Sequence, residues 1–225
     1  MDRILAADGD WQAGVADALA RVERPIPLDE RLLPRADDGR ARPRRWDRSS
    51  FPPARPAATL LAIYPGADGS LVIPLTVRRP ELRSHAGEVS LPGGAVDAAD
   101  GSHEAAALRE AWEEIGLDRS LVHIAGVLDD VWIPVSNFEL RPFVGTLDVQ
   151  PALVPHDAEV AAIVELPLAT LFDPEIVGME EFESRGLRIR AGAYRYGGVR
   201  VWGATAFTLG MLAHALAQPG AEPPA

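Results

Sequence analysis

The sequence contains no cysteine and no long apolar segment. Without cysteine the chain forms neither disulfides nor thiolate metal sites. The apolar run at 60–64 is far shorter than the roughly 20 residues that a membrane-spanning helix needs. The first residues show no basic stretch followed by an apolar core, so we expect no signal peptide and a cytoplasmic location.

Positive charge is also scarce. The chain has 22 Lys and Arg against 33 Asp and Glu, and the net charge of −11 argues against a nucleic-acid-binding protein. The hydrophobic fraction of 47% and the charged fraction of 24% are ordinary for a globular protein. We therefore expect neither nucleic acid nor a membrane as a partner. To bind an anionic small molecule, so acidic a protein needs metal ions or a local group of arginines.

Composition divides the chain into three parts. Apolar residues recur with helical spacing over 3–22, and the Pro- and Arg-rich stretch that follows has no clear period. We interpret residues 1–56 as an N-terminal helix and an arm, which is either a solvated basic loop or a phosphate-facing segment. Residues 57–217 carry the main domain, and residues 218–225 form a flexible tail.

Strand and helix signals are mixed along the main domain. Two strand-like runs, "AATLLAIY" and "LVIPLTV", flank the turn signal "PGADGS" and predict a hairpin. A helix is expected at 103–115, where Gly116 supplies a C-terminal stop. Further strands are expected near 121–128, 139–147 and 159–166, short strands over 180–202, and a last helix near 204–217. The order predicts a mixed sheet with helices packed on it, hence an α/β or α+β fold.

The helix at 103–115 concentrates negative charge. Glu110, Glu113 and Glu114 fall within an arc of roughly 100°, so their carboxylates can converge on one point. Like charges one turn apart weaken a helix, so the stretch is either a solvated acidic face or a site for a cation. Mg²⁺ prefers such carboxylate oxygens and keeps coordination positions open for substrate phosphate. Arg109 precedes Glu113 by four residues and can pair with it.

A double glycine lies upstream of this helix. Gly93 and Gly94 allow close backbone approach, and Gly94 can present its carbonyl as a further metal ligand. The stretch from Gly94 to Leu117 resembles the Nudix box, the signature of Mg²⁺-dependent hydrolases of nucleoside diphosphates linked to another group. The matching residues are Arg109, Glu110, Ala111, Glu113, Glu114, Gly116 and Leu117. One feature departs: Asp100 stands where the family has glutamate, and the loop after it is one residue longer.

Residues 75–94 resemble the signature of the coenzyme A pyrophosphatase branch of that family. The matching residues are Thr76, Arg78, Arg83, Gly87, Pro92, Gly93 and Gly94. Leu91 replaces the usual phenylalanine, and Arg79 replaces a small residue. Members of the branch also carry the longer loop with aspartate.

The resemblance implies a Nudix-type α/β/α sandwich with a mixed sheet. It also implies a metal-dependent hydrolase that cleaves the pyrophosphate of coenzyme A or acyl-coenzyme A to 3′,5′-ADP and (acyl-)4′-phosphopantetheine. Mg²⁺ or Mn²⁺ would be held by Glu110, Glu113, Glu114 and Gly94. Arg109 would orient the cluster, and a later carboxylate would ligate metal or act as base. Glu159 matches that segment best, with Glu165 as the fallback. The substrate is a small molecule, and family members are often homodimers.

Substrate contacts are expected from the stretch before the box. The expected contacts are Arg78, Arg83, His85, Gly93 and Gly94. The two arginines match phosphate oxygens in geometry, although pairing with Glu81 or Glu88 is an alternative. For the histidine, a structural hydrogen bond is an equal alternative. Two other functions stay open, namely a Nudix enzyme for ADP-ribose, NADH or another nucleoside diphosphate derivative, and a nucleotide-sensing module without turnover.

Overall fold

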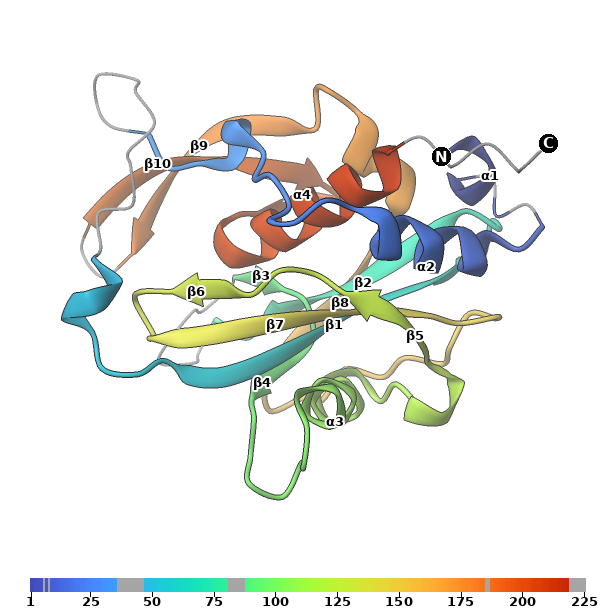
Figure 1. Ribbon diagram of the computed structural model, residues 1–225, viewed down its shortest axis with the longest axis horizontal. Coiled ribbons are helices and arrows are strands. Elements are labelled where there is room, and N and C mark those ends of the chain that lie inside the picture. The colour runs from blue at the N-terminus through green and yellow to red at the C-terminus, as the bar shows by residue number, and fades with distance from the viewer. Residues whose placement is uncertain (6, 8, 36–46, 81–87, 185–186, 219–225) are drawn as a thin grey trace.

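A mixed sheet forms the centre of the molecule in the computed structural model, which describes residues 1–5, 7, 9–35, 47–80, 88–184 and 187–218 (Figure 1). Over these ranges eight strands belong to it, in the order β3-β2-β1-β7-β5, with β4 paired to β1, β6 to β7 and β8 to β2. The strands are β1 (Arg55–Pro65), β2 (Leu71–Arg78), β3 (Val89–Ser90), β4 (Gly93–Ala95), β5 (His123–Val127), β6 (Val131–Ile133), β7 (Phe138–Thr146) and β8 (Val160–Pro167). β1 and β7 are parallel and the other described pairs are antiparallel, so the predicted mixed sheet is confirmed.

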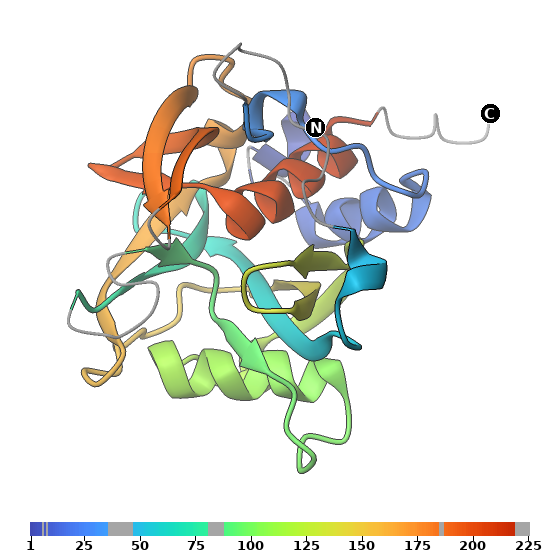
Figure 2. The same cartoon turned by 90° about the vertical axis from the view of Figure 1, so that its left-hand side faces the viewer.

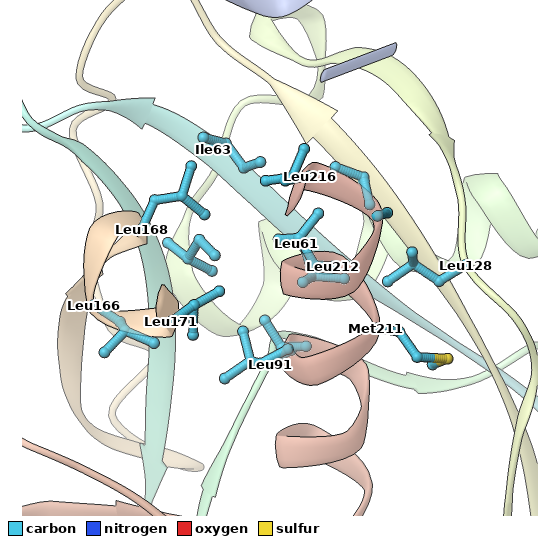
Figure 3. Packing of buried hydrophobic residues seen from close by; sticks show 14 of the residues in the cluster. Leu61, Ile63, Leu91, Leu128, Leu166, Leu168, Leu171, Met211, Leu212 and Leu216 are labelled. Atoms are coloured by element: carbon cyan, nitrogen blue, oxygen red, sulfur yellow. The ribbon is translucent and has the colours of Figure 1, made fainter. Parts of the chain in front are cut away.

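Helices cover both faces of this sheet (Figures 1 and 2). α3 (His103–Ile115) lies on one face, and α2 (Trp11–Arg21) and α4 (Gly203–Ala217) lie on the other. The side of the sheet facing α4 carries a large core rich in leucine and isoleucine side chains, and Figure 3 shows part of it around that helix, with Leu166, Leu168 and Leu171 on one side and Leu128 on the other. The side facing α3 carries a smaller core, to which the helix contributes alanines. These layers agree with the predicted α/β/α sandwich.

A second, three-stranded sheet lies beside α4. It consists of β9 (Val177–Ser184), β10 (Leu187–Tyr196) and β11 (Val199–Val201), in the order β11-β10-β9. Gly197 and Gly198 join β10 to β11 with φ angles of 58° and 80°, a conformation that glycine adopts without strain. The sequence predicts this alternation of strands and turns. It does not predict β6 in the central sheet, because three residues are too few to show a strand pattern.

The N-terminal region differs from the single helix expected over 3–22. It forms α1 (Asp2–Leu5) and α2, because the Asp10 carboxylate accepts a hydrogen bond from the amide of Ala13 and begins a new helix at Trp11. Residues up to Leu32 then contribute buried side chains to the same core as α4. The predicted arm is therefore packed against the domain at least as far as that residue. Its arginine-rich part, 36–46, lies outside the described residues.

Short 3-10 helices complete the fold. They are η1 (Glu30–Leu32), η2 (Arg48–Ser50), η3 (Arg119–Leu121) and η4 (Leu168–Phe172). Within the ranges that the structure describes, no helix has the length and apolar character needed to cross a membrane.

Candidate active site on helix α3

Local signals set both ends of α3. The hydroxyl of Ser102 accepts a hydrogen bond from the amide of Ala105 at 3.0 Å and satisfies a free donor of the first turn. Gly116 ends the helix with φ 67°, the left-handed conformation typical of a helix stop. The buried face of α3 includes small alanines, which let the helix approach β1 closely. The helix edge that carries the glutamates therefore lies against β4.

The two glycines of β4 make this approach possible. A Cβ on Gly93 would lie 2.4 Å from the carbonyl oxygen of Ala58, and one on Gly94 would lie 2.5 Å from Oε1 of Glu110. At Gly93 the clash is with backbone, so only glycine fits there; at Gly94 it is with the end of the Glu110 side chain, which would have to move from its present position. The amide of Gly93 also donates a hydrogen bond to Oε2 of Glu114 at 3.3 Å. The double glycine therefore holds β4 directly against two carboxylates of α3.

Glu114 and Glu110 are the buried carboxylates of the cluster. Burial raises the pKa of the Glu114 carboxyl to about 7, and the charges of Glu110 and Glu159 add to this increase. Burial likewise raises the pKa of Glu110, against the opposing hydrogen bond from Arg109. Arg78 lies near Glu114, with 3.9 Å between its Nη1 atom and Oε1. The structure thus concentrates negative charge where water solvates it poorly.

Arg109 connects the helix to the preceding loop. Its Nη1 atom donates to Glu110 at 2.9 Å and to Glu113 at 2.8 Å, which confirms the predicted pairing four residues apart. Its Nε and Nη2 atoms donate to the two carboxylate oxygens of Asp100, at 2.7 and 3.1 Å, and Nη2 also donates to the carbonyl of Ala95. These contacts use all five N–H groups of the guanidinium.

Asp100 is the residue near the cluster to which motif matching gave no role. It departs from the family pattern, yet its side chain is only 4% exposed, and the hydrogen bonds from Arg109 hold the pKa of its carboxyl below the usual range. The amide of Asp97 donates to the same carboxylate at 2.7 Å. The sequence offered a weak signal, because an aspartate in a loop can pair with an arginine of the following helix. Several acidic residues of that loop meet this condition, so the sequence did not single out Asp100.

Glu113 and Glu159 are the exposed members of the group. The Glu113 side chain is 54% exposed and pairs with Arg109. Glu159 precedes β8, and the amide of His156 in the same loop donates to the carbonyl of Glu114 at 2.9 Å. Since the charge of Glu159 raises the pKa of both Glu110 and Glu114, it lies within electrostatic range of the buried pair.

Glu165 lies elsewhere on β8 and has another partner. It accepts a hydrogen bond from the hydroxyl of Tyr64 at 2.8 Å and one from Gln150 at 3.2 Å. Burial, followed by this hydrogen bond, raises the pKa of the Tyr64 hydroxyl. Of the two alternatives for a later carboxylate, Glu159 is the one whose charge acts on the cluster.

The cluster fits a divalent cation by its chemistry. Within the described residues, no group of three or more acidic, histidine or cysteine side chains is arranged to hold a metal ion. Burial raises the pKa of both Glu110 and Glu114, so their charged forms are disfavoured in the absence of further positive charge. Arg109 is shared with Asp100, so it neutralises the pair only in part. A hard cation that binds carboxylate oxygens would supply the missing positive charge.

Two predicted substrate-binding residues, Arg83 and His85, lie outside the described residues. Arg78, Gly93 and Gly94 are described and adjoin the glutamates, as the contacts above show.

The family model and the similar proteins all point to the same family. The model of the NUDIX domain matches residues 53–184. Nudix hydrolase 15, mitochondrial, from Arabidopsis thaliana is 37% identical over 187 residues, covering 80% of this chain and 63% of its own length. An uncharacterized Nudix hydrolase NudL from Cronobacter sakazakii is 38% identical over 172 residues, covering 75% and 85% respectively.

Among solved structures, the Nudix hydrolase RenU from M. smegmatis matches 55% of this chain and 76% of its own, with a TM-score of 0.43 and 25% identity. The family model covers more than half of the chain, and the NudL relative is matched over most of its length. The chain therefore belongs to the Nudix family of hydrolases, enzymes that act on pyrophosphate bonds.

Proposed function

We propose that the chain hydrolyses the pyrophosphate bond of coenzyme A or an acyl-coenzyme A. The products are 3′,5′-ADP and 4′-phosphopantetheine or its acyl form. The observation that carries the proposal is the position of Arg78, which belongs to the branch signature and lies 3.9 Å from Glu114. A guanidinium can bind two phosphate oxygens at once. Its place beside the acidic helix supports a phosphate-containing substrate there.

The proposed metal ligands are Glu110, Glu113 and Glu114, together with the carbonyl of Gly94. Bound Mg²⁺ or Mn²⁺ would activate water and offset the charge that develops on the phosphates. Arg109 orients Glu110 and Glu113 through the hydrogen bonds from its Nη1 atom. Positioning and charge compensation of this kind account for most of the catalysis of phosphoryl transfer.

Glu159 is the proposed general base. It would take a proton from the attacking water, whose oxygen bonds to one phosphorus. The bond between that phosphorus and the bridging oxygen breaks, and the bridging oxygen leaves with the other phosphate. One water is consumed and two phosphomonoesters form. The electrostatic influence of Glu159 on the pKa values of Glu110 and Glu114 supports this role.

Product analysis tests the proposal. The purified chain is incubated with coenzyme A, ADP-ribose or NADH, each with Mg²⁺ or Mn²⁺, and products are identified by chromatography and mass spectrometry. We expect 3′,5′-ADP from coenzyme A and no turnover in EDTA. If ADP-ribose is cleaved while coenzyme A stays intact, the substrate proposal fails. Binding of nucleotides without any turnover would identify a sensing module instead. Two expectations stay predictions. They are the substrate contacts of Arg83 and His85 and the formation of a homodimer.

A further inference from the structure

Two consecutive arginines at the end of β2 have unused donors. The Nε atoms of Arg78 and Arg79 are buried, and neither has a hydrogen-bond partner in the described part of the chain. They are the two buried side-chain nitrogen or oxygen atoms in this condition over the described ranges. Native proteins rarely leave such a donor unpaired, and a functional role is one of the reasons when they do.

Arg79 is fixed at the rim of the proposed active site. Its amide donates a hydrogen bond to the carbonyl of Glu159 at 3.0 Å, which joins the end of β2 to the loop before β8. The charge of Glu159 in turn acts on Glu110 and Glu114. The backbone of Arg79 is therefore adjacent to the proposed base, and its side chain is only partly exposed.

A substrate phosphate at this site would meet strong negative charge. Four carboxylates repel a phosphate there, namely Glu110, Glu113, Glu114 and Glu159. Arg109 cannot help, because its five donors are all used within the protein. Among the arginines near the site that the structure describes, Arg78 and Arg79 each have a donor without a hydrogen-bond partner. A planar fork with free donors binds phosphate oxygens better than a point charge does.

We propose that Arg79 is a second phosphate-binding residue, acting beside Arg78 through its guanidinium. The inference rests on the proposed function and deepens it. The resembling coenzyme A pyrophosphatase branch has a small residue at this position, so Arg79 supplies a contact that such members lack. The ligand is a phosphate of the substrate, either in the pyrophosphate or a separate monoester such as the 3′-phosphate of coenzyme A.

Calorimetry measures the binding role of Arg79 without any need for turnover. Affinities for 3′,5′-ADP and for AMP are measured in EDTA with the wild type, Arg79→Ala, Arg79→Lys and Arg21→Ala. Arg21 is the matched control, since it lies on α2 and pairs only with the exposed Asp17. We expect Arg79→Ala to weaken 3′,5′-ADP binding about tenfold or more, Arg79→Lys to recover part of the loss, and the control to stay at the wild-type value. Equal affinities for Arg79→Ala and the control, or no measurable binding by the wild type, would overturn the inference.

Steady-state kinetics with coenzyme A and dephospho-coenzyme A then identify the phosphate. A KM increase in Arg79→Ala for coenzyme A alone indicates the 3′-phosphate, and an increase for both substrates indicates the pyrophosphate. An unchanged KM for both contradicts the inference. Unfolding temperatures equal to that of the wild type check that the variants fold. If the wild type does not hydrolyse coenzyme A, the proposed function fails, and the calorimetry still decides the role of Arg79.

Discussion

Replacing Asp100 by asparagine should loosen Arg109 and slow hydrolysis without removing a proposed metal ligand. Asp100 accepts hydrogen bonds from Nε and Nη2 of Arg109, at 2.7 and 3.1 Å. Asparagine keeps one acceptor but loses the charge and turns an N–H group toward the guanidinium. A hydrogen bond to a charged group contributes about 1.5–3 kcal/mol, and Arg109 is partly exposed, so we expect a loss of about 2 kcal/mol. In a chain of this size that lowers Tm by roughly 4–8 °C.

The same substitution should lower kcat, because Arg109 orients Glu110 and Glu113. Small misplacements of catalytic groups reduce rates by up to about a hundredfold, and we expect a decrease of roughly tenfold to a hundredfold. Scanning calorimetry and steady-state hydrolysis measure both effects. Asp97→Asn is the matched control, since Asp97 is 71% exposed and lies 3.9 Å from the same guanidinium. If Asp100→Asn matches this control in Tm and kcat, Asp100 does not hold the site together.

Three further predictions test other parts of the site. Glu114→Gln should reduce kcat by orders of magnitude. It should not lower Tm at pH 8, because that pH exceeds the raised Glu114 pKa of about 7, so the neutral amide replaces a carboxylate charge that burial disfavours. Normal turnover by this variant would show that the cluster is only an acidic surface. Gly93→Ala should destabilise the fold by about 3 kcal/mol in urea unfolding, since its Cβ meets Ala58 at 2.4 Å; an unchanged midpoint would contradict the tight approach of β4. Glu159→Gln should lower kcat, while Glu165→Gln should leave it nearly unchanged, and equal effects in a hydrolysis assay would remove Glu159 as base.

Local chemistry explains why α3 could be predicted so closely. Its observed bounds coincide with the predicted 103–115, because the stop at Gly116 and the apolar spacing act within one or two turns. The hairpin of β1 and β2 was likewise predicted from its turn residues and confirmed. Signals of this kind need no knowledge of the rest of the chain.

Burial within the cluster could not be predicted in the same way. Glu113 and Glu114 are neighbours on one helix, yet the Glu113 side chain is 54% exposed and that of Glu114 only 7%. The difference in exposure depends on which edge of α3 meets β4. That placement depends in turn on the sheet, which includes the parallel pairing of β1 with β7, two segments far apart in sequence. The inward packing of residues up to Leu32 also depends on distant partners on α4 and β10.

By itself the sequence determined the acidic helix, the double glycine before it and the resemblance to a phosphate-anhydride hydrolase, since these depend on residue type and spacing. Only the tertiary structure decided that Asp100 accepts hydrogen bonds from Arg109, that Glu165 accepts one from Tyr64, and that the Nε atoms of Arg78 and Arg79 are buried without a hydrogen-bond partner. The physical reason is that a partner's identity and its desolvation are properties of the folded surroundings. The same glutamates would be an ordinary solvated surface if β4 did not lie against them.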